Sequence, residues 1–267
     1  MPEGQVSHGN ARRLGAALAG LPLVAVEAPE PRLASQRIPE RLAGDAVAAV
    51  EAVGKHHLIR LASGRTLHSH LGMGGRWLLR PAGTALRRSG LWLALRTEAH
   101  VAAQYGGPRL RLYEPGVAVP GLAALGPDLL DPGVSPGRAM AAGLAAIDPQ
   151  REIGEALVDQ RVAAGVGNVV KSEALFLCGL DPWRSVGTID PADATALGET
   201  AARILADGVR AGGPLVTRRP PGAPPWRGGR WVYRRAGRPC LRCGTPVRSR
   251  GQGDANRTTY WCPACQR

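Results

Sequence analysis

Lysine is nearly missing from this chain of 267 residues. Only two of its 34 basic residues are lysines, Lys55 and Lys171, and all the others are arginines. Lysine is ordinarily among the commonest residues, so each retained lysine is a candidate for a role that arginine cannot fill. A biased genome that favours Arg, Ala, Gly and Pro is the alternative explanation of the composition, and it stays open here.

Long hydrophobic runs and the marks of a secretion signal are also lacking. No stretch of the chain reaches the roughly 18 apolar residues that a membrane span needs. The start, Met1-Pro2-Glu3-Gly4-Gln5, has neither the basic nor the apolar region of a signal peptide. We therefore expect a cytoplasmic protein without a membrane partner. The 44% of hydrophobic residues excludes a wholly disordered chain.

Acidic residues are few, 21 against 34 basic ones, which gives a net charge of +13. Residues 218–267 contain twelve Arg and one acidic residue, Asp254, for +11, whereas residues 1–217 contain 22 basic and 20 acidic residues, for +2. The excess is therefore concentrated at one end of the chain. A basic segment of this kind favours a polyanionic partner, above all nucleic acid.

Four of the five cysteines form two pairs, Cys240-x2-Cys243 and Cys262-x2-Cys265, with eighteen residues between them. This spacing is typical of a zinc ribbon, in which two turns each aim two thiolates at one tetrahedral ion. Because four sulfur ligands leave no open position, we expect one structural Zn²⁺ and no catalytic metal. Two disulfides are the alternative, which the lack of a secretion signal disfavours. The remaining Cys178 is interpreted as a small buried residue.

The pattern of apolar residues changes near the middle of the chain. After a helix over 5–18, short segments rich in Val, Ile and Leu predict an antiparallel sandwich up to about Gly126, and from residue 135 the period becomes helical. The expected strands are 23–26, 46–53, 57–61, 66–71, 77–79, 91–95 and 109–113, and the expected helices are 135–146, 152–161, 168–178 and 191–211.

These patterns predict an α+β protein of several domains. We expect an N-terminal antiparallel β-sandwich with a flanking helix over 1–126, a helical domain over 127–217, and a basic linker with a zinc-bound tail over 218–267. Residues 164–168 predict a glycine-containing turn that enters a helix with Asn168 as its N-cap. Residues 218–230, rich in Pro and Gly, predict a flexible linker or loop.

Three separated motifs point to one family. They are Met1-Pro2-Glu3-Gly4, Gly165-Val166-Gly167-Asn168-Val169-Val170-Lys171-Ser172-Glu173 and Tyr260-Trp261-Cys262-Pro263-Ala264-Cys265-Gln266. With them the chain resembles, from end to end, the family of formamidopyrimidine-DNA glycosylase and endonuclease VIII. Three features are most similar to the endonuclease VIII branch, especially its members of actinobacterial type. They are the Met1-Pro2-Glu3-Gly4 start, the stretch Gly54-Lys55-His56-His57-Leu58 and the Trp261-Cys262-Pro263 ending. The resemblance implies a catalytic β-sandwich, a helix-two-turns-helix domain and a C-terminal zinc-finger hairpin with four cysteine ligands.

The resemblance also implies an activity. Members are bifunctional DNA glycosylases and abasic-site lyases of base excision repair, so the expected substrate is damaged DNA, double- or single-stranded, with oxidised pyrimidines as the main lesions. The expected protein is a bacterial monomer that is nucleoid-associated when bound to DNA. It needs no organic cofactor.

Three residues carry the implied chemistry. Removal of Met1 would expose the secondary amine of Pro2, which is partly unprotonated at neutral pH and can attack the sugar C1′ of a damaged nucleotide. Glu3 matches the family's general acid and base. Lys55 matches the family's lysine on the turn before a strand, which contacts the target phosphate and can protonate the leaving base. Their alternatives are a processed terminus, a solvated acid and a surface charge.

Five further residues are expected to bind DNA. Asn168 and the glycine turn offer backbone N–H groups to a phosphate, and Lys171, one turn into the helix, adds charge or supports the turn. Arg257 matches the arginine that the family's zinc-bound hairpin presents to phosphate. Met73 aligns with the residue that fills the space of the extruded nucleotide, and His70 contacts phosphate. A core methionine and a satisfied strand histidine are the alternatives for the last two.

Two departures from the family pattern bear on substrate and activity. The region Gln104-Tyr105-Gly106-Gly107-Pro108-Arg109-Leu110-Arg111 lacks the Pro-Arg-Arg-Phe type of motif found in the purine-directed branch, which weakens an oxidised-guanine assignment. Gln5-Val6-Ser7 stands where many members have a second acid. Two alternatives therefore remain: a non-catalytic protein that binds lesion or abasic DNA, and a zinc-ribbon adaptor, which leaves Pro2, Glu3 and Lys55 unexplained.

Overall fold

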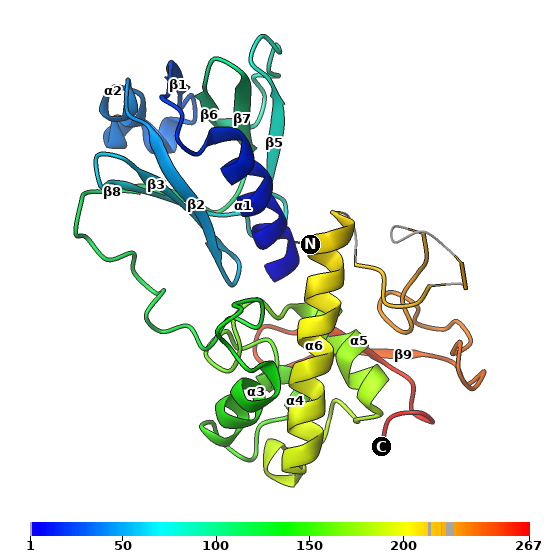
Figure 1. Cartoon of the computed structure of the whole chain (residues 1–267). Coiled ribbons are helices and arrows are strands. Elements are labelled where there is room, and N and C mark those ends of the chain that lie inside the picture. The colour runs from blue at the N-terminus through cyan, green and yellow to red at the C-terminus, as the bar shows by residue number, and fades with distance from the viewer. Residues whose placement is uncertain (1, 213–214, 220, 223–226) are drawn as a thin grey trace. The chain divides into compact units, whose positions relative to one another are not determined.

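The computed structural model describes residues 2–212, 215–219, 221–222 and 227–267. The chain divides into two compact units, one of Met1–Pro2 and Val6–Ala123, the other of Glu3–Gln5 and Ala124–Arg267. Helix α1 (Gly4–Leu18) therefore begins in the second unit and continues in the first (Figure 1). None of the helices in the described ranges combines the length and apolarity of a bilayer-spanning segment.

The first unit contains two four-stranded antiparallel sheets, ordered β1-β6-β7-β5 and β2-β3-β4-β8. Apolar side chains from both sheets and from α1, among them Leu18, Ile59, Leu67 and Leu93, share one buried core. The predicted sandwich with a flanking helix is confirmed. The strands are β1 (Ala25–Glu27), β2 (Val47–Val53), β3 (His56–Leu61), β4 (Thr66–His70), β5 (Arg76–Pro81), β6 (Leu91–Arg96), β7 (His100–Tyr105) and β8 (Arg109–Tyr113).

Strand β7, in the middle of one sheet of the first unit, was not predicted from the sequence. Strand β7 pairs with both β5 and β6, and five of its six residues are buried. Burial on both faces removes the alternation of polar and apolar residues by which a strand is recognised. The short helices η1 (Pro31–Gln36) and α2 (Ile38–Leu42) were not predicted either, because neither reaches the length at which a helical period becomes visible.

The second unit is helical, with α3 (Pro136–Ala145), α4 (Ile153–Ala156), α5 (Asn168–Cys178), η2 (Val186–Thr188) and α6 (Pro191–Ala211) around one core. Helix α6 begins where the Asp190 side chain accepts a hydrogen bond from the Ala192 N–H at 2.7 Å. The predicted helix over 152–161 is wrong beyond residue 156. There the carboxylate of Asp159 accepts from the backbone N–H of Arg161 at 3.0 Å, a local bond that competes with helix formation.

The C-terminal hairpin consists of β9 (Arg248–Gln252) and β10 (Arg257–Trp261), paired from Trp261 with Arg248 to Arg257 with Gln252. A small core beside it contains Phe176 of α5 and two of the paired cysteines, Cys240 and Cys262. The predicted four-cysteine hairpin is confirmed. Residues 218–230, expected as a linker or loop, contain an isolated antiparallel bridge between Arg218 and Gly229.

Candidate active site and nucleic-acid interface

Glu3 is held at the start of α5. Glu3 is 1% exposed. Its carboxylate oxygens accept hydrogen bonds from the backbone N–H of Val169 at 2.7 Å and of Val170 at 3.2 Å. The positive end of the helix dipole stabilises the ionised carboxylate there. Pro2, half-buried and outside the helix, is the neighbour of Glu3 in the chain. The proposed nucleophile is therefore covalently joined to a fixed acid.

The glycine turn before α5 makes room for this carboxylate. A Cβ on Gly167 would lie 2.3 Å from Cδ of Glu3. The Gly165 carbonyl, at a residue with φ of +94°, accepts from the Gly4 N–H at 2.9 Å. Glu3 therefore engages the helix N–H groups of Val169 and Val170. Binding of DNA phosphate by the glycine turn and Asn168 stays a prediction. The N-cap is Gly167, and Asn168, which was predicted as the N-cap, is the first helical residue.

Asn168 connects α5 to the hairpin. It is 6% exposed, and its Nδ2 donates to the Thr258 carbonyl at 2.7 Å. An asparagine amide has two N–H donors, so the second can serve a phosphate. Arg257, the first residue of β10, is exposed. These two predicted DNA-binding residues therefore lie on the same α5 and hairpin junction.

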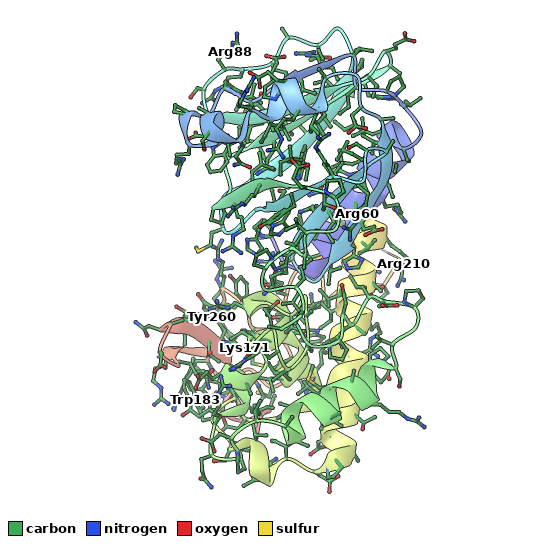
Figure 2. The ribbon with its side chains drawn as sticks, turned by 90° about the vertical axis from the view of Figure 1, so that its left-hand side faces the viewer. Arg60, Arg88, Lys171, Trp183, Arg210 and Tyr260 are labelled. Carbon is green, nitrogen blue, oxygen red and sulfur yellow. The ribbon has the colours of Figure 1, made fainter. Side chains whose placement is uncertain are left out.

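Lys171 is buried at this junction, 1% exposed, where its Nζ donates to Thr259 Oγ1 at 2.6 Å. Figure 2 shows it beside the hairpin strand that carries Tyr260. Thr259 in turn donates to Gln252 Oε1 at 2.6 Å. Burial, with a smaller contribution from the positive charge of Arg257, lowers the pKa of Lys171 to about 8. Lys171 therefore connects α5 to strand β10 of the hairpin, and its role in DNA binding stays a prediction.

Replacement of Lys171 by Met is expected to change how stability depends on pH. The unfolded lysine keeps its proton up to its ordinary pKa of about 10.4, whereas the folded one releases it near pH 8. The wild-type free energy of unfolding should therefore rise from pH 8 to pH 10.5 relative to the variant, by up to about 3 kcal/mol. Guanidinium denaturation of zinc-loaded protein across this range measures the difference. A constant difference would contradict the prediction.

Lys55 and His70 come together in the first unit. Lys55 lies in the two-residue turn between β2 and β3, after Gly54 with φ of +56°, and the next residue, His56, pairs across the sheet with His70. Nδ1 of His70 accepts from the Gly72 N–H at 3.2 Å. Burial, then the charges of Lys55 and Arg109, lower the pKa of His70. The neutral ring therefore carries its proton on Nε2, where it can donate to a phosphate.

Met73 is 80% exposed, which removes the alternative that it is a core residue. The segment that carries Met73 packs against residues 107–108, in the region that lacks the purine-branch motif. A Cβ on Gly72 would lie 2.5 Å from Pro108 Cδ, and a Cβ on Gly75 would lie 3.0 Å from Gly107 Cα. The exposed methionine is thus presented by a short segment that packs closely on its neighbour.

Three histidines beside Lys55 were not singled out by the sequence analysis. His56 and His68 share a hydrogen bond of 2.8 Å between Nδ1 and Nε2, and their rings stack at 5.0 Å. Burial is the main cause that lowers the pKa of His56 and His57 to about 3 and of His68 to about 4. The group is therefore uncharged at neutral pH. The signal in the sequence is the paired His56-His57 followed by His68-x-His70.

The four paired cysteines converge. Their sulfur atoms all lie within 4.8 Å of one another, with 3.9 Å between Cys240 and Cys265 and 3.5 Å between Cys243 and Cys262. A tetrahedral zinc ion with Zn–S bonds of about 2.3 Å would place its sulfurs about 3.8 Å apart, so the set fits this metal. Among the described residues it is the only group of three or more metal-ligating side chains. Cys178 stands apart and is half-buried rather than fully buried.

Family models match most of the chain. The formamidopyrimidine-DNA glycosylase N-terminal domain matches residues 1–111, and the formamidopyrimidine-DNA glycosylase H2TH domain, the helix-two-turns-helix module, matches residues 125–219. The chain belongs to the formamidopyrimidine-DNA glycosylase family. This confirms the family that the three motifs indicated.

Curated family members include a probable endonuclease 8 2 of Streptomyces coelicolor, 43% identical over 100% of this chain and 94% of its own length. A DNA-(apurinic or apyrimidinic site) lyase Nei2 of Mycolicibacterium smegmatis is 38% identical over 100% of this chain and 99% of its own. Both organisms are actinobacteria, as the motifs indicated. The Lactococcus lactis family member in complex with abasic-site DNA shares the fold, with a TM-score of 0.82, 22% identity and 99% coverage of both chains.

Proposed function

We propose that this protein is a bifunctional DNA glycosylase and abasic-site lyase of base excision repair. The observation that carries the proposal is the buried Glu3 carboxylate, fixed at the start of α5 and adjacent in the chain to Pro2. Membership of the family and relatives named as endonucleases 8 and an abasic-site lyase support it. Oxidised pyrimidines are the proposed lesions.

The proposed chemistry begins at the Pro2 amine. Met1 lies outside the described residues, and its removal is part of the proposal. The nitrogen attacks C1′ while the bond from C1′ to the base breaks. The base leaves with the electron pair of that bond and takes up a proton that Lys55 can supply. Loss of the amine proton and opening of the sugar then leave an iminium ion. Glu3 moves the protons that ring opening requires. The iminium acidifies C2′, so that loss of a C2′ proton expels the 3′ phosphate, and a second elimination expels the 5′ phosphate.

The DNA-binding roles follow the geometry of each unit. In the first unit Lys55 and the Nε2 of His70 are assigned to the target phosphate, and exposed Met73 is assigned to the space left by the extruded nucleotide. In the second unit Asn168 and Arg257 are assigned to flanking phosphates. The division into a catalytic domain 1–126, a helix-two-turns-helix domain 127–217 and a zinc-finger segment 218–267 remains our proposal.

The four cysteines would hold one structural Zn²⁺. Their sulfur spacing fits the metal, and a site of four thiolates has no position for substrate. The metal would fix the two turns that carry the hairpin. No other metal or organic cofactor enters the proposed reaction.

Borohydride reduction in the presence of abasic DNA tests the proposal. Correctly processed, zinc-loaded protein should form a covalent protein–DNA complex through Pro2, located by peptide mass analysis, and should cleave a panel of oxidised pyrimidines faster than oxidised purines. Failure to trap any complex would refute the lyase. Tight binding to abasic-analogue DNA without trapping would establish the non-catalytic alternative. The feature that favours this alternative is Gln5, which is 4% exposed and stands in place of a second acid.

Replacement of Gly167 by Ala is expected to lower the lyase rate by at least about 100-fold. The new methyl group would collide with the Glu3 carboxylate, at 2.3 Å from its Cδ, and loss of a positioned acid or base typically costs at least about 100-fold. Single-turnover cleavage of abasic DNA measures the rate. Gly9 in α1, with open space around its Cβ position, provides the matched control Gly9→Ala. Equal rates in the two variants would contradict the role of Glu3.

A further inference from the structure

A basic cavity of about 760 Å³ opens in the second unit. Five of its lining residues are arginines, and none of its described lining residues is acidic. The cavity that Arg257 lines is different: it measures about 210 Å³ and includes three acidic residues. Five of the twelve arginines of residues 218–267 therefore line a cavity to which no role has been assigned. The five arginines are Arg218, Arg227, Arg230, Arg234 and Arg235.

The two walls of this cavity are held by one buried carboxylate. Glu173 of α5 is 0% exposed and accepts hydrogen bonds from the backbone N–H of Trp231 at 2.8 Å, Val232 at 2.9 Å and Tyr233 at 2.8 Å. It also accepts from the Thr217 hydroxyl. Glu173 thus joins Thr217, which precedes Arg218, to residues 231–233, which lie between Arg230 and Arg234. Its carboxylate oxygens are engaged by these donors. The walls are further paired by the Arg218 and Gly229 bridge.

The guanidinium groups are ordered by aromatic rings rather than by acids. Arg230 and Arg234 lie over the ring of Tyr233 at 5.1 and 5.7 Å, and Arg218 lies over the ring of Trp231 at 5.7 Å. Such stacking engages the face of a guanidinium rather than its N–H edge. Nε of Arg230 donates to the Leu215 carbonyl at 3.2 Å, and its two terminal nitrogens have no hydrogen-bond partner among the described residues. Within the described ranges, none of the five arginines forms an ion pair.

One buried donor also faces no acceptor. Nε of Arg235 is buried and has no hydrogen-bond partner among the described residues, although its Nη2 donates to the Pro239 carbonyl at 2.9 Å. An unpaired buried donor on a charged group is costly, and five like charges in one concavity repel one another. The repulsion between the arginines is reduced when an anion with several acceptor oxygens enters the cavity.

We propose that this cavity binds the phosphodiester chain of nucleic acid, as a second anchoring site outside the residues assigned to the lesion. The inference rests on the proposed function, which supplies DNA as the polyanion. A guanidinium edge matches the paired oxygens of a phosphate, and arginines along two walls match successive phosphates rather than a single ion. The site would add affinity without reading sequence.

Salt dependence of DNA binding tests the site. The variant Arg227→Ala/Arg230→Ala/Arg234→Ala removes three positive charges from the cavity, and the control Arg80→Ala/Arg87→Ala/Arg138→Ala removes three exposed ones elsewhere. Fluorescence anisotropy with a lesion-free duplex gives Kd from low to high salt. The slope of log K against log salt should become shallower by about 2 to 3 in the cavity variant, since each lost phosphate contact contributes about 0.9. Its Kd at 0.1 M salt should rise by at least about tenfold.

Zinc content and melting temperature show whether each variant is folded. Should the triple variant unfold, Arg227→Gln alone, at an exposed position, should still reduce the slope by about one. Slopes equal to those of the control would overturn the proposal. Loss of tripolyphosphate binding with unchanged DNA binding would overturn the nucleic-acid assignment.

Borohydride trapping at saturating abasic DNA separates this inference from the proposed function. Wild-type trapping together with unchanged slopes in the cavity variant overturns the anchoring site alone. Absence of trapping in the wild type overturns the proposed function, and a shallower slope in the cavity variant then still supports the anchoring site.

Discussion

A peptide extension on the N-terminus of Pro2 is expected to abolish covalent trapping of abasic DNA, with a fall of at least about 1,000-fold in lyase rate. Acylation turns the secondary amine into an amide, whose nitrogen lone pair is delocalised into the carbonyl and cannot attack C1′. Removal of a covalent nucleophile costs several orders of magnitude. DNA affinity should change by less than about threefold, because Lys55, Asn168 and Arg257 are retained. Borohydride trapping and anisotropy on the same preparation measure the two effects.

The control for this prediction is the same preparation after proteolytic release of the extension, so that Pro2 becomes the first residue. Trapping should return with the released amine. Equal trapping by protein whose intact mass shows a complete extension would refute Pro2 as the nucleophile. Loss of both trapping and binding would point to disturbance of Glu3 and the α5 turn instead.

Loss of the metal is expected to have the second large effect. Removal of zinc, or Cys262→Ser, should unfold the hairpin and weaken DNA binding by at least about 100-fold. Cys262 is 0% exposed and shares a small core with Phe176 and Val247. Structural zinc contributes about 10–16 kcal/mol of folding free energy in small zinc peptides, which matches the whole stability of many domains. The loss should also release Asn168 and Lys171 from β10.

Colorimetric zinc release, tryptophan fluorescence and anisotropy follow this transition together. Cys178→Ser is the matched control, because this thiol lies outside the four-cysteine group. It should leave zinc content and DNA affinity unchanged. Metal-free protein that binds DNA as tightly as the zinc-loaded form would contradict the structural role of the site.

Whether a strand or helix could be predicted from the sequence depends on how that element is stabilised. Strands with one buried face, such as β8, and the long amphipathic α6 could be read from their period. Strand β7 is buried on both sides, and β9, with the sequence Arg-Ser-Arg-Gly-Gln, has no apolar side chain to mark a face. The hairpin depends on pairing and on the cysteine turns, which local sequence does not encode.

The candidate site shows the same limit. Spacing alone was enough for the four cysteines, because each pair is local. The destination of the Glu3 carboxylate was not predictable, since its partners Val169 and Val170 lie 166 and 167 residues away. The hydrogen bonds that Glu173 accepts from Thr217 and from residues 231–233 were not predictable for the same reason. The sequence around a helical carboxylate does not indicate which distant backbone N–H groups will donate to it.

The long separation between Glu3 and its partners has a consequence during synthesis. A ribosome adding about 5–20 residues per second needs roughly 10–30 s to proceed from Glu3 to Val169, 166 residues later. Throughout that interval the first residues of the nascent chain lack the contacts that bury Glu3. An aminopeptidase acting on emerging chains thus has time to cut after Met1 before the adjacent Glu3 becomes buried.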